Sequence, residues 1–190
     1  MFREQVKSAL ASFVILTILT GIIYPFLVTG IARLLFSRQA NGSLIYREGK
    51  AVGSILIGQP FDDPRCFWGR LSATNPPYNA GASSGSNYGP MNQSLTDAAK
   101  ARIDALHKAD PNNNAPVPVD LVTSSGSGLD PDISVAAAMY QVPRVARALK
   151  LDEAKVRDLV MRHVEDRQFG VLGEKRVNVP KLNLSLDSVE

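Results

Sequence analysis

Apolar residues are concentrated near the N-terminal end of the chain. Residues 8–32 contain no Asp, Glu, Lys, Arg or His, and Leu, Ile, Val and Phe predominate there. A helix of this length reaches about 37 Å, which is enough to cross a hydrocarbon core of about 30 Å with some tilt. The run is longer than the core of a signal peptide, and no small-x-small cleavage motif follows it before Arg33. The pattern therefore predicts an uncleaved transmembrane helix over 8–32, preceded by a short tail, 1–7.

Small or polar residues recur on one side of this predicted helix. Thr17, Gly21, Pro25 and Thr29 follow one another at intervals of four residues. Because lipid tails are as apolar as leucine, membrane helices associate through close backbone approach and polar contacts. Single-span anchors also carry some Gly and Thr without a partner, so packing on another membrane protein is one of two interpretations of this face.

The charges on either side of the apolar run do not settle its orientation. Arg3 and Lys7 precede it, and more basic residues follow it, beginning with Arg33 and Arg38. Such a distribution favours a cytoplasmic C-terminal part. A long folded segment, however, translocates largely regardless of its charge. Charge alone therefore leaves both orientations open.

The remaining chain, 33–190, changes between strand-like and helix-like patterns. A Gly at position 49 can adopt a positive φ in a turn, so the first two apolar runs predict a β-hairpin. The last run contains Pro180, which predicts an edge strand. The predicted strands are 44–47, 52–57, 66–68, 117–123 and 177–186.

Helical spacing of apolar residues appears in three further segments. Ser94 and Asp97 form a capping-box pattern before a helix over 95–106. A second helical segment is predicted over 134–140, and Pro143 is expected to end that helix or to start the next one. Asp152 is a predicted N-cap for the helix that includes 156–164. Because strands and helices occur in mixed order, we predict an α+β fold for 33–190.

A long segment, 72–93, has no hydrophobic period. It is dominated by Ser, Asn, Gly, Pro and Ala. Its length exceeds that of ordinary connections, so it is either a functional loop or a flexible one. Tyr78, Tyr88 and Met91 interrupt the polar run and are expected to hold the loop against a surface.

Composition excludes several classes of site. The chain has one cysteine, two histidines and a net charge of +3. A single cysteine excludes intramolecular disulfides and cysteine-rich zinc patterns, and the small charge excess is far below that of a nucleic-acid-binding domain. We interpret Cys66 as a small buried residue, His163 as a half-buried core residue and His107 as a helix-terminal residue. No metal site is predicted.

Residues 81–85 match the G-x-S-x-G pattern of a serine hydrolase, with Ser83 as the nucleophile. That motif requires a hydrophobic strand before the serine and a helix after it. Here Pro76, Pro77 and Pro90 interrupt the flanking sequence. We therefore attribute the match to composition, and a membrane-tethered hydrolase remains a minor alternative.

Several motifs resemble those of one family, the C subunits of bacterial Kdp potassium-transporting ATPases. The resemblance covers nearly the whole chain, beginning with the apolar N-terminal segment. Its specific motifs are SATNP at 72–76, SGSNYGPMN at 84–92, SGSGLDPDIS at 125–134 and QVPRVA at 141–146.

This resemblance implies an accessory subunit without catalytic groups of its own. Its helix and outer domain would hold together a potassium-binding, channel-like subunit and a P-type ATPase subunit in the bacterial inner membrane. The N-terminus would be cytoplasmic and the large domain periplasmic.

The resemblance also implies a chaperone role in which the subunit raises the ATP affinity of the ATPase subunit. In that view the 125–129 loop is compared with the signature loop of ABC transporters, and Gln141 is a nucleotide contact. Because ATP is cytoplasmic, this role conflicts with a periplasmic domain, and we favour the structural role. A free-standing extracytoplasmic module that grips peptide or glycan through 72–93 is a further alternative.

Overall fold

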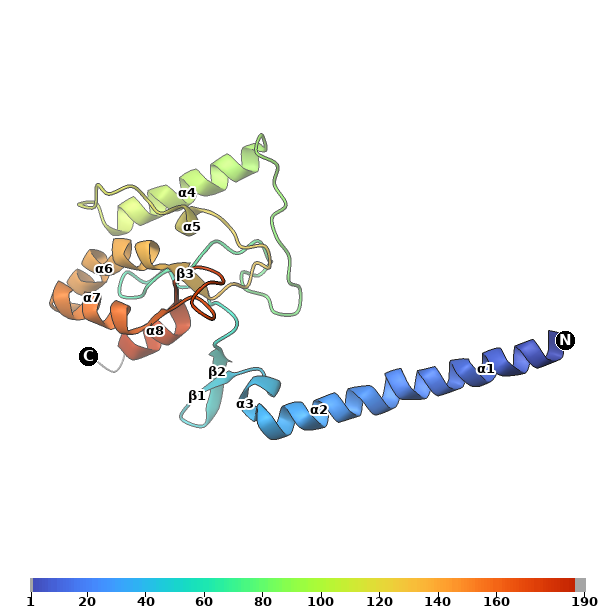
Figure 1. The fold of residues 1–190 in the computed structure, drawn as a ribbon. Coiled ribbons are helices and arrows are strands. Elements are labelled where there is room, and N and C mark those ends of the chain that lie inside the picture. The colour runs from blue at the N-terminus through green and yellow to red at the C-terminus, as the bar shows by residue number, and fades with distance from the viewer. Residues whose placement is uncertain (1, 187–190) are drawn as a thin grey trace. The chain divides into compact units, whose positions relative to one another are not determined.

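The computed structural model describes residues 2–186. The chain divides into two compact units, with the boundary in the sequence between Val52 and Gly53. Residue 1 of the predicted tail and residues 187–190 of the predicted C-terminal domain lie outside the described residues. The fold class is confirmed, because one long apolar helix precedes a mixed helix-and-strand region (Figure 1).

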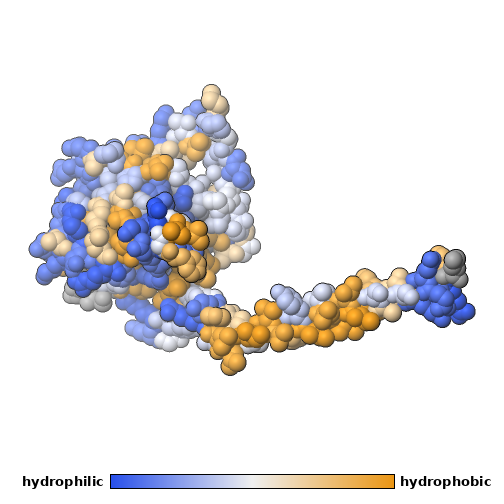
Figure 2. Space-filling model, viewed as in Figure 1, coloured by the Kyte–Doolittle hydropathy of each residue, from blue (hydrophilic) through white to orange (hydrophobic). Residues whose placement is uncertain are grey.

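The first unit begins with a continuous helix from Phe2 to Leu35. It consists of α1 (Phe2–Ile18), a π-helical turn η1 (Leu19–Ile23) and α2 (Tyr24–Leu35). Within residues 2–186 this is the one helix long and apolar enough to cross a membrane, and none of its apolar window is buried. Figure 2 shows the apolar side chains along its surface. The predicted helix is confirmed as one long and apolar enough to span a membrane, and it continues past 8–32 at both ends.

The π-turn has a local cause. Pro25 has no N–H, so it cannot donate to the carbonyl four residues earlier. Just before it the helix widens, and the Tyr24 N–H donates to the Leu19 carbonyl five residues back. The helix therefore passes the proline without ending.

A short helix, α3 (Ser37–Ala40), and a β-hairpin follow. The hairpin pairs β1 (Leu44–Arg47) with β2 (Lys50–Ser54) and turns at Gly49, whose φ is +77°. The predicted hairpin is confirmed, although its second strand ends at Ser54 rather than at residue 57.

The second unit places helices around a small antiparallel sheet. The strand order is β3-β5-β4, so the last strand in the chain is the central one. Val177 on the central strand is paired with Ile133 of β3 on one side and with Val164 of β4 on the other. The elements are α4 (Gln93–Ala109), α5 (Val119–Val122), β3 (Asp132–Ser134), α6 (Val135–Leu149), α7 (Glu153–Arg162), β4 (Val164–Glu165), β5 (Arg176–Asn178) and α8 (Val179–Leu186).

Helix α6 runs through the core of this unit and continues past Pro143. The prediction that Pro143 ends a helix or starts the next one is wrong in both of its alternatives. A proline inside a helix costs about 3 kcal/mol. Complete burial of one valine contributes about 1.5–3 kcal/mol, and both Val142 and Val145 are fully buried beside it. Two such side chains are enough to outweigh the proline.

Three predicted strands are wrong. The segment 117–123 forms the short helix α5, whose Leu121 is fully buried. The segment 177–186 is the end of the central strand β5 followed by helix α8, with Pro180 in the first turn of that helix, where its missing N–H is harmless. Residues 66–68 pair with no strand, because side-chain amides take up their backbone groups.

The predicted helices are confirmed, with one corrected cap and one corrected end: α7 stops at Arg162, and Val164, predicted to lie on its apolar face, begins strand β4. The α4 helix begins at Gln93, and the side chain of Asn92 accepts the Ser94 N–H at 2.9 Å. Ser94 is therefore inside the helix and is not its N-cap. Asp152 caps α7 as predicted, accepting the Ala154 N–H at 2.9 Å. Residues 72–92 contain no helix or strand, as predicted.

Candidate functional site

The predicted helix-packing residues lie on the exposed surface of the membrane helix. Thr17, Gly21, Pro25 and Thr29 are all exposed. On an ideal α-helix, steps of four residues drift by about 40° each. The wider π-turn rotates less per residue and so reduces that drift between Thr17 and Pro25. The four residues therefore form a narrow face, which we call the small-residue stripe.

The helix surface is hollowed along the second half of this stripe. A groove of about 450 Å³ is lined by Pro25, Phe26, Thr29, Gly30 and Arg33. It exists because Gly30 has no side chain and Thr29 has a short one. Such a surface lets another helix approach the backbone closely.

The two Gly/Ser segments that carry the family resemblance are joined in the second unit. The Ser72 hydroxyl donates to the Gly128 carbonyl at 2.6 Å, and the Ser84 N–H donates to the Ser127 carbonyl at 3.0 Å. Gly128 has a φ of +68°, and a Cβ there would lie 2.6 Å from the Ser84 carbonyl oxygen. Only glycine fits at position 128, where the backbones of the two loops approach each other closely.

Ser83 belongs to the same junction. Its hydroxyl donates to the Ser127 carbonyl at 3.0 Å, and neither a strand nor a helix flanks it. Among the described residues, the ring nitrogens of His163 hydrogen-bond with the Leu159 carbonyl and the Ser185 hydroxyl rather than with Ser83. The geometry thus gives Ser83 a structural hydrogen bond and supplies it with no strained strand-to-helix turn.

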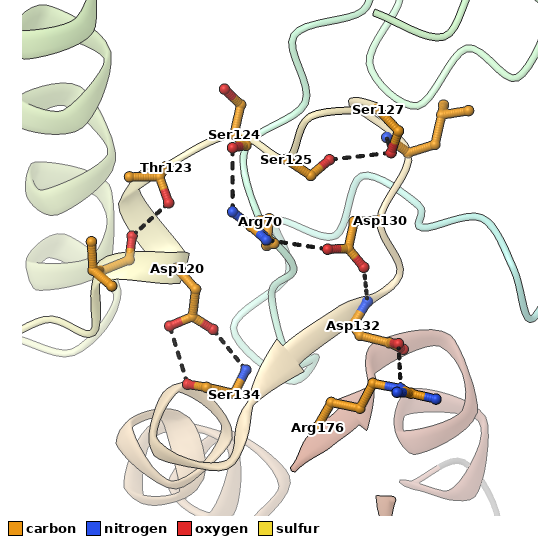
Figure 3. Close-up of polar contacts among 12 residues, drawn as sticks. Arg70, Asp120, Thr123, Ser124, Ser125, Ser127, Asp130, Asp132, Ser134 and Arg176 are labelled. Carbon is orange, nitrogen blue, oxygen red and sulfur yellow. Dashed lines mark hydrogen bonds and ion pairs between the residues drawn. The ribbon is translucent and has the colours of Figure 1, made fainter. Parts of the chain in front are cut away.

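A chain of charged residues continues from this junction to the sheet (Figure 3). Arg70 contacts Asp130 at 3.2 Å and donates to the Ser124 carbonyl at 3.3 Å. Asp130 in turn accepts the Asp132 N–H at 3.0 Å, and Asp132 pairs with Arg176 at 2.9 Å. Four charged side chains therefore connect one loop to strands β3 and β5.

Burial raises the pKa of the Asp132 carboxyl, and its hydrogen bond from Asn178 opposes that shift. Asp120 makes a second connection, because its carboxylate accepts both the N–H and the hydroxyl of Ser134. The Ser134 hydroxyl also accepts the Ala137 N–H and so caps α6. These carboxylates position backbone at the start of the central helix.

Gln141, the predicted nucleotide contact, lies in the core. It is 1% exposed. Its Oε1 accepts the Trp68 N–H at 2.8 Å and an Arg144 N–H at 2.7 Å, and its Nε2 donates to the Trp68 carbonyl at 3.1 Å. A nucleotide contact through this amide stays a prediction, and it requires these hydrogen bonds to open.

Around Gln141 lies a group of residues that the sequence analysis did not single out. Two guanidinium groups lie over the ring of Trp68, that of Arg102 at 4.9 Å and that of Arg144 at 4.7 Å from the ring centroid. Burial lowers the pKa of Arg144 to about 10. Arg144 donates to the backbone carbonyls of Pro64 and Cys66, so a charged group fastens this segment. The contacts join residues far apart in sequence, which no local pattern reveals.

The remaining candidate residues are scattered. Cys66 is partly exposed rather than buried as predicted. His163 is half-buried as predicted, and His107 lies in the last turn of α4. In the part of the chain that the structure describes, no three His, Cys, Asp or Glu residues are placed to hold a metal ion. The polar side chains that are gathered together bind backbone and each other.

Fold and contacts together define a membrane-anchored α+β protein in which polar side chains fix loops against a small sheet. A family model described as the c chain of the K⁺-transporting ATPase, KdpC, matches residues 6–188. The chain belongs to this family.

Similar curated proteins cover almost the whole chain. A potassium-transporting ATPase KdpC subunit from Methylococcus capsulatus is 64% identical over 184 residues, which are 96% of this chain and 97% of that protein. The subunits from Herpetosiphon aurantiacus and Dechloromonas aromatica are 60% and 58% identical. They cover 99% and 98% of this chain, and 98% of each relative is covered.

Proposed function

We propose that this chain is an accessory subunit that holds a K⁺-transporting ATPase complex together. The observation that carries the proposal is the membrane helix, which buries none of its apolar window within this chain and presents a small-residue stripe. Membership of the family supports a place in a K⁺-transporting ATPase. A helix that serves only as an anchor has no need of such a face, since leucine would suit lipid equally well.

The proposed partners are a channel-like subunit that binds potassium and a P-type ATPase subunit. The stripe of Thr17, Gly21, Pro25 and Thr29 packs on a membrane helix of one of them, and the α+β domain contacts the complex outside the cytoplasm, with the N-terminus inside. In this arrangement the turnover chemistry belongs to the partner chains. The described contacts support this, because the gathered carboxylates and hydroxyls are used to fix loops.

The test is to fill the stripe. Replacing Thr17, Gly21 and Thr29 together by leucine keeps the helix apolar but prevents close backbone approach. We expect the tagged chain to retain severalfold less of its partner subunits after purification in mild detergent, and potassium-stimulated ATP hydrolysis to fall in parallel.

The matched control is Ser12→Leu. Ser12 precedes Thr17 by five residues and points about 140° away from it on an α-helix, so this change places a single leucine on another side of the helix. It should leave both readouts at the wild-type level. If the stripe variant also behaves as wild type, the helix does not hold the complex through this face.

A further inference from the structure

The connection between β4 and β5 carries an exposed group of apolar side chains at its turn. Residues 168–172 form a tight turn in which Gln168 and Leu172 exchange two backbone hydrogen bonds of 2.9 Å each. Phe169 is 91% exposed, Val171 73% and Leu172 56%. We call these three side chains the apolar tip.

The backbone at this tip is unfavourable for the residue it carries. Phe169 has a φ of +53°, in the left-handed region that bulky residues rarely adopt. A glycine or asparagine would satisfy the same backbone at lower cost. In this chain the aromatic ring gains no burial in return. The free energy that the strain costs is therefore recovered only if the ring is buried against something else.

The charges next to the tip indicate what that partner is. Arg167 pairs with Glu174 at 2.7 Å, and Lys175 pairs with Asp166 at 3.6 Å. Loops that bind anionic lipid carry an excess of basic side chains. Here each of these two basic residues is neutralised by a carboxylate of the same segment. This charge balance matches an uncharged apolar pocket with a polar rim, as found at the centres of protein interfaces.

The size of the tip indicates how it works. A large aromatic side chain buries about 150–250 Å², whereas a stable interface needs about 800 Å² from each partner. Three side chains supply roughly half of that area. The tip alone is too small for an independent complex, but a chain already tethered by a membrane helix binds its second contact at a raised effective concentration.

We propose that Phe169, Val171 and Leu172 insert together into an uncharged apolar pocket on another subunit of the K⁺-transporting ATPase complex. The inference rests on the proposed function and adds a second contact, in the α+β domain, to the one made by the membrane helix. Phe169 is the central anchor, and the ion pairs at the base of the turn form the rim.

Phe169→Asn in the full-length chain tests this anchor. Asparagine tolerates a positive φ, so the turn and the thermal unfolding of the domain should be preserved. The apparent affinity for the partner subunits, measured from their loss on successive dilution of the purified complex, should fall about tenfold, since a central aromatic anchor commonly contributes that much. Met91→Asn is the control, because Met91 is 95% exposed on another loop and should have no effect.

A second variant separates protein from lipid as the occupant. The natural Trp68 is buried, so a tryptophan introduced as Phe169→Trp reports on the tip. Its emission should shift to the blue and resist acrylamide quenching in the complex. It should stay solvent-like when the chain alone is placed in vesicles of phosphatidylcholine and phosphatidylglycerol. A blue shift in those vesicles without partner subunits overturns the proposal in favour of a lipid contact.

The outcomes also separate this inference from the proposed function. If the stripe variant loses its partners while Phe169→Asn retains them fully, the helix contact stands and the apolar tip is not an anchor. If the wild-type chain retains no partner subunit at all, both proposals are overturned.

Discussion

Two buried amides act as substitutes for a neighbouring strand. Asn183 accepts the Phe67 N–H at 2.8 Å and donates to its carbonyl at 2.9 Å, and Gln141 does the same for Trp68. A buried backbone group without a partner costs about 1–3 kcal/mol. These amides are therefore what allows an apolar segment without a strand partner to enter the core.

This arrangement predicts the effect of Gln141→Leu. The change leaves the Trp68 N–H and carbonyl unpaired in the core and removes an acceptor from Arg144. We expect a loss of about 2–4 kcal/mol in unfolding free energy and a fall of roughly 5–10 °C in the melting temperature. Thermal unfolding of the full-length chain in detergent measures this.

Gln93→Leu, at an exposed position on α4, is the matched control and should be nearly neutral. The nucleotide hypothesis makes the opposite forecast for Gln141→Leu. It expects unchanged unfolding together with a reduced ATP affinity of the assembled complex, and that combination would show that the amide serves ATP rather than the core.

Among the elements, β4, β5 and α8 are tied by one carboxylate. Glu165 on β4 pairs with Lys181 on α8 at 2.6 Å and with Arg176 on β5 at 3.0 Å. The hydrogen bond from Lys181 is the main cause that lowers the pKa of Glu165 below its ordinary value of 4.5, and burial opposes it. The pairing holds the last helix against the sheet.

The lowered pKa predicts a pH-dependent effect of Lys181→Met. A carboxylate with a depressed folded-state pKa stabilises the fold above its ordinary value and loses that contribution as the pH falls through the folded value. Because both side chains are about a third exposed, the variant should lose at most about 1 kcal/mol near neutral pH. The difference from wild type should disappear in acid, well below pH 4.5.

Urea unfolding near pH 7 and near pH 3 measures the two limits. Lys155→Met, on the exposed side of α7, should cost little at either pH. A cost for Lys181→Met that persists unchanged in acid would mean that the lysine acts through packing of its alkyl chain rather than through Glu165.

For the whole molecule, the division into two units has a functional consequence. Every residue of the buried hydrophobic cluster lies in the second unit, between Phe67 and Leu186. A fragment 41–190, which keeps the hairpin but not the membrane helix, should therefore be soluble and melt as the domain does in the full-length chain. When it is added to membranes that lack the chain, we expect it not to restore potassium-stimulated ATP hydrolysis.

An independent binding module would behave differently. If the fragment alone restored the activity, or if any unrelated anchor could replace residues 2–35 without loss, the helix would be only a tether and the alternative of a free-standing module would be favoured. Circular dichroism shows whether the fragment folds, and a phosphate-release assay on membranes measures the activity.

Features that depend on neighbouring residues could be predicted from the sequence. The membrane helix, its small-residue stripe, the hairpin at Gly49 and helices α4, α6 and α7 repeat a simple pattern or contain a local turn or cap signal. Such elements form from contacts within a few residues, so their pattern is sufficient. The stripe belongs to this class because all four residues lie on one helix.

Other features were decided by the tertiary structure. The apolar runs 117–123 and 177–186 are short, and a short apolar run suits a buried helix as well as a strand; packing made α5 and α8 of them. Arg70 and Asp130 are 60 residues apart, and Phe67 and Asn183 are 116 apart. Sequence by itself determined where this chain can cross a membrane and where helices α4, α6 and α7 lie. Only folding decided which side chains meet, because a contact between distant residues depends on the paths of all the elements between them.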